Sequence, residues 1–130
     1  TIKGKRILIA EDNELNAEIA KTVLEDVGAL ITRAENGQQA LELFKEKPAG
    51  TFDVILMDLM MPVMDGITAT KAIRSLTRPD AKTIPILAMT ANAFEEDAKQ
   101  CFAAGMNAHI AKPVDMEFLE KTLQRIYEQL

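Results

Sequence analysis

The chain has 130 residues, 48% of them hydrophobic, which is long enough for one well-packed core and too short for two ordinary domains. We therefore expect a single domain over residues 1–130. The net charge of -5, from 20 acidic and 15 basic residues, argues against a nucleic-acid-binding surface, because phosphate backbones are bound by an excess of Lys and Arg.

Short segments rich in Ile, Val and Leu alternate along the chain with longer segments of helical period. This alternation is typical of parallel strands joined by crossover helices. Five strands are predicted: Arg6 to Ala10, Leu30 to Ala34, Asp53 to Met57, Ile84 to Met89 and Ala108 to Ile110. The first, third and fourth contain consecutive apolar residues without polar alternation, which indicates strands buried on both faces.

Each predicted strand is followed by a predicted helix with an apolar stripe. The first helix runs from about Glu14 to Val27 and ends at Gly28, and the third runs from about Asp65 to Ser75, before a polar loop from Thr77 to Thr83 that contains Pro79. The stripes expected to face inward are Leu15, Ile19 and Val23 in the first helix, Ala40, Leu41 and Phe44 in the second, Phe94, Ala98, Cys101 and Phe102 in the fourth, and Met116, Leu119, Leu123, Ile126, Tyr127 and Leu130 in the last.

Five right-handed βα units that cover both faces of one parallel sheet predict a doubly wound α/β fold of three layers, (βα)5, with the flavodoxin-like strand order 2-1-3-4-5. In such folds, ligands bind beyond the carboxyl ends of the strands, near the point where the strand order reverses. The residues that end or follow the strands are therefore the candidates for a site.

Those candidates carry a distinctive set of polar groups. Glu11 and Asp12 follow the first strand, Asp58 ends the third, Thr90 follows the fourth and Lys112 follows the fifth. Three carboxylates that meet at one edge repel one another unless a cation compensates them. A set of oxygen ligands without a His or Cys cage favours Mg²⁺.

The same residues suggest phosphoryl transfer. Mg²⁺ neutralises phosphate oxygens and so permits attack by a carboxylate, and Asp58 is the best nucleophile candidate because a buried strand places it at the edge. Lys112 would bind the phosphoryl oxygens by its charge, and the Thr90 hydroxyl would donate a hydrogen bond to one of them.

The ordered set formed by Glu11-Asp12, the segment M-D-L-M-M-P-V-M-D-G from Met57 to Gly66, Thr90-Ala91 and Lys112-Pro113 resembles the response-regulator receiver domain family (CheY-like) over essentially the whole chain. The resemblance implies that Asp58 is the phosphoacceptor. It also implies that Asp12 binds Mg²⁺ directly, that Glu11 binds it largely through water, and that the main-chain carbonyl of Met60 completes the protein ligands. A cis peptide bond before Pro113 would aim Lys112 inward.

The resemblance further implies a switch in which Thr90 moves toward the phosphoryl group and the side chain three residues before Lys112 turns inward. That position is His109, where many family members have Tyr or Phe, so the aromatic part of the switch is in question here. The implied output surface is formed by the fourth helix, the fifth strand and the fifth helix of the (βα)5 pattern.

Two segments, T-A-N-A-F from Thr90 and A-H-I-A-K-P-V-D from Ala108, are similar in sequence to the receivers of hybrid histidine kinases. This similarity implies a histidine kinase or a histidine-phosphotransfer domain as the partner, with no direct contact to nucleic acid or membrane. A stand-alone response regulator is the alternative.

Localisation is expected to be cytoplasmic, including the inner face of the inner membrane if the parent protein carries an anchor. Cys101 is the only cysteine, which excludes an internal disulfide and fits a reducing compartment. Uninterrupted apolar segments such as Val54 to Met57 are far shorter than the roughly 18 residues of a membrane-spanning helix, and the N-terminus lacks the pattern of a signal peptide.

Simpler interpretations and one rival enzyme stay open. One simpler interpretation is that Glu11 and Asp12 only interact favourably with the dipole of the helix that follows them. We assign no catalytic role to the single histidine, His109. A Mg²⁺-dependent phosphohydrolase with an aspartyl nucleophile would use similar chemistry. Such enzymes usually place a second acid two residues beyond the nucleophile, where this chain has Met60.

Overall fold

The computed structural model describes residues 2–90 and 95–128, and within them it places five strands and six helices. In chain order these are β1 (Arg6–Ala10), α1 (Glu14–Asp26), β2 (Leu30–Ala34), α2 (Gly37–Glu46), β3 (Val54–Asp58), α3 (Gly66–Arg74), α4 (Asp80–Thr83), β4 (Ile86–Thr90), α5 (Glu95–Ala104), β5 (Ala108–Ala111) and α6 (Met116–Glu128). The predicted residues Phe94 and Leu130 lie outside the described residues, as does the side chain of Ala98.

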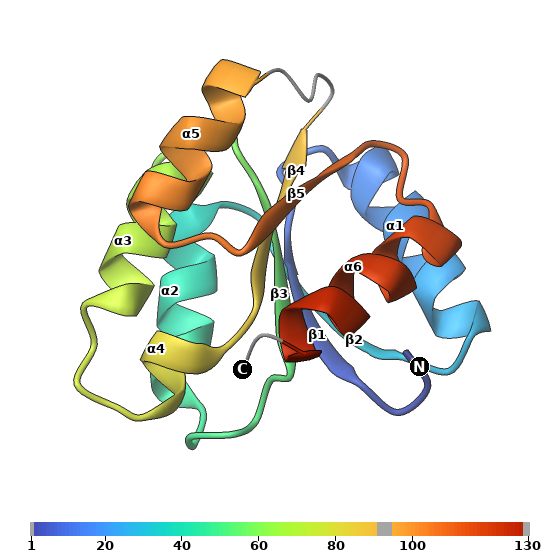
Figure 1. The fold of residues 1–130 in the computed structure, drawn as a ribbon, viewed down its shortest axis with the longest axis horizontal. Helices are drawn as coiled ribbons and strands as arrows, with labels where there is room; N and C mark the ends of the chain where they lie inside the picture. Colours follow the sequence, from blue (N-terminus) through green and yellow to red (C-terminus); the bar gives the residue numbers. More distant parts are fainter. Residues whose placement is uncertain (1, 91–94, 129–130) are drawn as a thin grey trace.

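The strands form one parallel sheet in the order β2-β1-β3-β4-β5, which confirms the predicted doubly wound fold. Helices α1 and α6 cover one face of the sheet, and α2, α3, α4 and α5 lie on the other (Figure 1). The chain crosses from β1 to its two neighbours in opposite directions, so the strand order reverses at β1 and β3. Ligands bind at this position in folds of this type.

A separate apolar core lies on each face of the sheet. Phe44, Ile73 and Cys101 belong to the core under α2, α3 and α5, and Leu24 and Leu119 belong to the core under α1 and α6. The buried position of Cys101 on the α5 stripe agrees with the sequence pattern. Because β1, β3 and β4 lie between these two cores, their apolar runs are buried on both sides.

One predicted loop and the predicted ends of two strands differ from the structure. The segment Thr77 to Thr83, predicted as a loop, contains the four-residue helix α4, which begins after Pro79. Proline is tolerated at the start of a helix, where its missing N–H would have no partner. The predicted strands Asp53 to Met57 and Ile84 to Met89 stop one residue early, because Asp58 and Thr90 are the last residues of β3 and β4, so the sheet itself holds both main chains.

The inward face predicted for α1 is wrong for two of its three residues, and the third, Val23, is half-buried. Leu15 and Ile19 are 69% and 44% exposed, whereas Ala17, Ala20 and Leu24 are buried. At 3.6 residues per turn the two groups lie on opposite sides of the helix. The small Ala17 and Ala20 allow α1 to pack closely on the sheet, whereas Leu15 and Ile19 remain at the surface.

Two large residues of the other predicted stripes are also partly exposed. Phe102 of α5 is 54% exposed and Tyr127 of α6 is 38% exposed. The Tyr127 ring lies under the ammonium of Lys5, 4.8 Å from the ring centroid, so it covers the edge of the core rather than filling it. Helical spacing alone therefore does not separate the residues that fill the core from those at its exposed edge.

The connection between β3 and α3, residues 59–65, is held against its neighbours by close main-chain contacts at Gly37 and Gly66. The N–H of Gly66 donates to the carbonyl of Leu59, and the N–H of Gly37 donates to the carbonyl of Met64. A Cβ built on Gly66 would lie 2.2 Å from the carbonyl oxygen of Asp58, and one on Gly37 would lie 2.3 Å from that of Met64. Neither position can accept a side chain without a shift of the main chain.

We predict that Gly66→Ala destabilises the protein by about 1–3 kcal/mol, because the added methyl group overlaps the end of β3. Helix propensity alone predicts the opposite sign, since alanine is favoured over glycine by about 1 kcal/mol in a helix. Urea denaturation of Gly66→Ala beside Thr68→Ala, an exposed position in the same helix turn, separates the two effects. Equal free energies of unfolding for the two variants would show that the overlap with the end of β3 does not destabilise Gly66→Ala.

Candidate functional site

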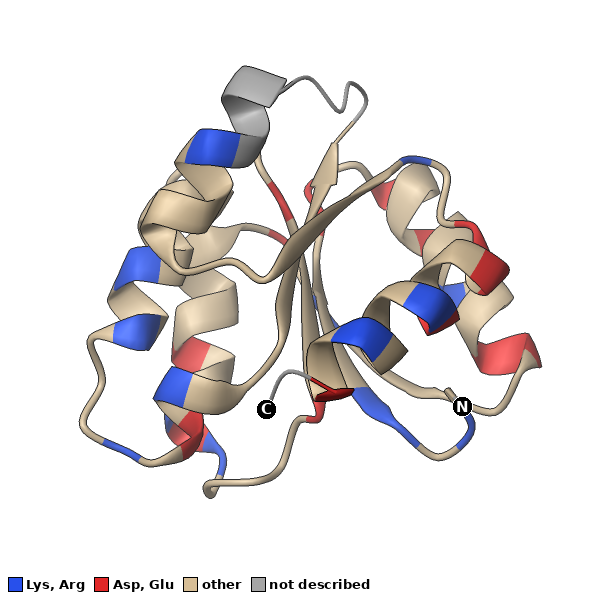
Figure 2. Cartoon of the chain, in the orientation of Figure 1, with Lys and Arg blue, Asp and Glu red and all other residues tan. Residues whose placement is uncertain are grey.

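Three carboxylates gather at the carboxyl edge of the sheet, where β1 and β3 lie side by side. Glu11 and Asp12 follow β1, and Asp58 ends β3. One carboxylate oxygen of each lies within 4.8 Å of those of the other two. Acidic segments meet at the upper ends of these two strands (Figure 2). The structure therefore brings together the three acids that the sequence placed at strand ends.

The three acids differ in their exposure. Glu11 is 2% exposed and Asp58 is 4% exposed, whereas Asp12 is exposed. Burial disfavours the charged form of a carboxylate, so Glu11 and Asp58 require compensating partners. Asp12 leaves one side of the cluster open to solvent and to a ligand.

Lys112 supplies the compensating charge. Its Nζ lies 2.8 Å from Oε1 of Glu11 and 3.1 Å from Oδ2 of Asp58. Burial alone lowers the pKa of Lys112, but the hydrogen bonds and charges of Glu11 and Asp58 together outweigh it and raise the pKa above the ordinary value. The peptide bond between Lys112 and Pro113 is cis, as the family resemblance implies.

The donor set of this cluster fits a hard divalent cation. A single ammonium faces three carboxylates, so an excess of negative charge remains at the cluster. Within the described residues the cluster contains carboxylate oxygens and neither His nor Cys. Oxygen ligands of this kind suit Mg²⁺ or Ca²⁺ and disfavour softer metals.

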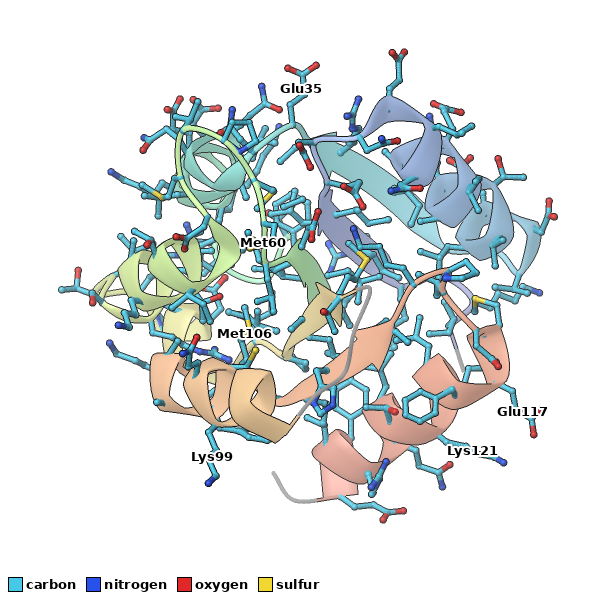
Figure 3. The ribbon with its side chains drawn as sticks, turned by 90° about the horizontal axis from the view of Figure 1, so that it is seen from above. Glu35, Met60, Lys99, Met106, Glu117 and Lys121 are labelled. Atoms are coloured by element: carbon cyan, nitrogen blue, oxygen red, sulfur yellow. The ribbon has the colours of Figure 1, made fainter. Side chains whose placement is uncertain are left out.

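The remaining predicted residues lie at or near the same edge. Thr90 ends β4 next to β3, and its carbonyl accepts a hydrogen bond from the N–H of Lys112 at 2.9 Å. The N–H of Met60 points to Oδ1 of Asp58 at 3.4 Å, while its side chain is 82% exposed. Figure 3 shows Met60 near the centre of this edge as seen from above.

His109 lies away from the carboxylates. It is half-buried on β5, paired with Ala88, and lines a separate pocket with Phe102 of α5 and Phe118 and Arg125 of α6. The structure therefore places His109 outside the acidic cluster and on the surface between α5 and α6.

Sequence reasoning missed three residues that shape the site. Gly37 and Gly66 allow the main-chain contacts described above, and Arg33 of β2 donates hydrogen bonds to the carbonyls of Glu11 and Asp12. The signals available were the glycines of the pairs Asn36-Gly37 and Asp65-Gly66 and an arginine within the strand Leu30–Ala34. Neither signal identifies its contact partner without the fold.

A pocket of about 350 Å³ adjoins the cluster on the side of α1. Its lining includes Glu11 and Lys112 together with Ile19 of α1 and Val114 of the loop that precedes α6. Ile19 and the nearby Leu15 form an exposed apolar surface on α1. The charged cluster is therefore flanked by apolar groups that a protein partner could contact.

In the part of the chain that the structure describes, no helix has both the length and the apolar character needed to cross a bilayer.

Comparisons with known proteins agree with this geometry. The family model described as the response regulator receiver domain matches residues 7–124. Hybrid signal transduction histidine kinase M of Dictyostelium discoideum is 42% identical over 92% of the chain, which corresponds to 5% of that protein. The chain spans 5% to 15% of the length of the curated histidine kinases it matches.

Solved structures give the same result. A receiver domain of a sensor histidine kinase from Pseudomonas aeruginosa, with magnesium coordinated in its active site cleft, is 38% identical with a TM-score of 0.81, covering 94% of this chain and 96% of that one. The receiver domain of the response regulator Ssk1 of Saccharomyces cerevisiae, solved with the histidine phosphotransfer protein Ypd1, is 30% identical with a TM-score of 0.78, covering 93% and 87%.

The sheet has the order 2-1-3-4-5, its carboxyl edge carries an acidic cluster beside the half-buried Lys112, and the family model matches residues 7–124. The chain belongs to the response regulator receiver domain family, the signalling domains of two-component phosphorelays.

Proposed function

We propose that this receiver domain accepts a phosphoryl group on Asp58 in a Mg²⁺-dependent reaction. The observation that carries the proposal is the position of the Asp58 carboxylate, which is 4% exposed, contacts Lys112 and lies beside two further acids. A buried acid that merely stabilised the fold would gain from one cation and would not be placed among two more carboxylates.

The proposed ligands of Mg²⁺ are the carboxylates of Asp12 and Asp58, Glu11 through water, and the main-chain carbonyl of Met60. The Pseudomonas relative, which has magnesium in its cleft, supports this assignment, as does the all-oxygen cluster of this chain. When bound, the cation would neutralise phosphoryl oxygens that the three acids would otherwise repel.

In the proposed transfer, a carboxylate oxygen of Asp58 attacks the phosphorus of a phosphohistidine donor. The new O–P bond forms as the P–N bond breaks, and the imidazole leaves with the electron pair of that bond. The ammonium of Lys112 binds a phosphoryl oxygen in place of part of its contact with Asp58, and the Thr90 hydroxyl donates to another. Attack of water on the acyl phosphate would reverse the state, so the domain would catalyse both its own phosphorylation and its dephosphorylation.

The proposed phosphodonor is a histidine-phosphotransfer domain, or a histidine kinase, within a hybrid-kinase phosphorelay. The relatives among hybrid kinases and the Ssk1 receiver solved with Ypd1 support this assignment. So does the exposed apolar surface formed by Leu15 and Ile19, because Ile19 lines a pocket together with Glu11 and Lys112, and a docked partner would cover this surface.

The proposed output runs from Thr90 toward the surface formed by α5, β5 and α6. His109 lies on this surface and lines a pocket together with Phe102 and Phe118. We propose that it takes the place of the aromatic switch residue, since a half-buried side chain in a pocket can change its position when β4 shifts.

The proposal predicts that acetyl phosphate with Mg²⁺ yields one phosphoryl adduct per chain, detectable by mass spectrometry. The adduct is labile in base and absent from Asp58→Asn, because Asp58 is the proposed nucleophile, whereas Glu11, the other carboxylate that contacts Lys112, is a proposed metal ligand. Repeated hydrolysis of p-nitrophenyl phosphate would instead identify a phosphohydrolase. An adduct that persists in Asp58→Asn would assign the phosphoacceptor to another residue.

We predict that Lys112→Met lowers the metal-free stability by about 1–3 kcal/mol, because it leaves the buried Glu11 and Asp58 without their cation. The raised pKa of Lys112 implies that its contribution is complete below the ordinary value of 10.5 and is lost as the pH rises through the raised value. Urea denaturation in EDTA at neutral and alkaline pH measures both effects.

Mg²⁺ should stabilise Lys112→Met more than it stabilises the wild type, since the cation replaces the missing charge of Lys112. Lys121→Met is the matched control, because the ion pair of Lys121 with Glu117 is exposed (Figure 3) and its loss should have little effect. Loss of Mg²⁺ affinity in Lys112→Met as severe as in Asp12→Asn would contradict the assigned role.

We predict that Ile19→Asp slows phosphoryl transfer from phosphorylated Ypd1 by about tenfold, because loss of a central apolar contact costs about 1–2 kcal/mol of binding. The rate with acetyl phosphate should not change, since this small donor needs no docking surface. Phe102→Asp is the control, because Phe102 is also an exposed apolar residue but lies on α5. A variant slowed with both donors would show damage to the site rather than to docking.

A further inference from the structure

The loop of residues 11–13 between β1 and α1 carries two of the three carboxylates and is held by an arginine from the neighbouring strand. Arg33, half-buried on β2, donates from Nε and Nη2 to the carbonyl of Glu11 at 3.2 and 2.9 Å. The same Nη2 donates to the carbonyl of Asp12 at 3.3 Å. β1 and β2 are adjacent and parallel (Figure 1), and the loop leaves β1 where this pairing ends, at Ala10 and Ala34.

We propose that Arg33 is a positioning residue for the metal site, a role that rests on the Mg²⁺-dependent function proposed above. It acts through Glu11 and Asp12 and does not contact the cation. Its guanidinium supplies donors to these two carbonyls at the point where the pairing of β1 with β2 has ended. The acidic loop can then leave the sheet without leaving its main-chain oxygens unpaired.

The contacts around the loop explain how this fixes the carboxylates. The N–H of Glu11 donates to the carbonyl of Ala34 at 3.1 Å, and Oε2 of Glu11 accepts from the N–H of Asn13 at 3.2 Å. With the N–H held by β2 and the carbonyl held by Arg33, both sides of the Glu11 residue are fixed. The side chains of Glu11 and Asp12 are therefore directed toward β3 and Asp58.

The two cations near the site have different contacts. Lys112 binds carboxylate oxygens directly, at 2.8 and 3.1 Å, whereas Arg33 binds main-chain oxygens. Arg33 therefore stabilises the loop without occupying the oxygens that a cation needs. Groups that hold metal ligands in position without contacting the metal affect its affinity strongly, and their removal typically weakens binding by about tenfold or more.

Arg6 at the opposite end of β1 provides a matched control. Its Nη2 donates to the carbonyl of Gly50 at 2.8 Å, and it pairs with Asp53. It therefore also binds a loop carbonyl from a strand, but at the edge of the sheet remote from the acids. Arg6→Met should reduce stability and leave Mg²⁺ affinity unchanged.

The test is the dissociation constant for Mg²⁺ of the wild type, Arg33→Met, Arg33→Lys and Arg6→Met, together with the rate of phosphorylation by acetyl phosphate at saturating Mg²⁺. Arg33→Met should bind Mg²⁺ about tenfold more weakly, and its rate should return close to that of the wild type at saturation. Arg33→Lys retains the charge and one donor group. Its Mg²⁺ affinity should lie between those of the wild type and Arg33→Met, and this comparison remains informative if Arg33→Met folds poorly.

An Arg33→Met variant with wild-type Mg²⁺ affinity would overturn the inference and leave the proposed function intact. The same holds if Arg33→Lys binds Mg²⁺ as weakly as Arg33→Met, or if Arg6→Met loses as much affinity as Arg33→Met, because the effect would then be a general loss of stability. A wild-type protein that does not bind Mg²⁺ is a distinct result, which would overturn the proposed function and this inference together.

Discussion

Three carboxylates within 4.8 Å of one another, two of them almost completely buried, create a repulsion that the rest of the fold must accommodate. Lys112, directly after β5, relieves part of this repulsion, and an excess of negative charge remains beside Asp12, which is open to solvent. The parallel sheet makes this arrangement possible, because β1 and β3 are neighbours and both end at the same edge.

Main-chain contacts hold these charges in place. Gly66 packs against the carbonyl of Asp58, Gly37 packs against the connection from β3 to α3, and Arg33 binds the carbonyls beside the acid pair. None of these three residues would contact a phosphoryl group. They determine whether the residues that would contact it lie at the correct distance, so the chemistry proposed for Asp58 depends on packing several residues away.

The buried strands and the site could be predicted from the sequence because both depend on strong local patterns. Consecutive apolar residues in β1, β3 and β4 indicate strands buried on both faces, and parallel strands bring Glu11, Asp58 and Lys112 to one edge. The family resemblance added the expected roles of these residues, and membership of the family is confirmed by the match to residues 7–124.

What could not be predicted depends on tertiary contacts. Helix α1 has apolar residues on both sides, and hydrophobicity alone favours the larger Leu15 and Ile19 over the alanines that pack on the sheet. The short α4 has too few residues to show a helical period. The contacts of Gly66 and Arg33 join segments that are distant in sequence or carry no local signal.

The central claim is that a divalent cation binds among the carboxylates of residues 11, 12 and 58. Adding substoichiometric Mn²⁺ to the isotope-labelled domain and recording its backbone amide spectrum tests this most directly, because a paramagnetic ion broadens nearby signals. A cation bound at this cluster should cause early loss of the amide signals of Glu11, Asp12, Asp58 and Met60, and these signals should recover on competition with Mg²⁺. Broadening centred on the exposed acids of α1, Glu14 and Glu18, with the signals of β1 and β3 intact, would contradict it.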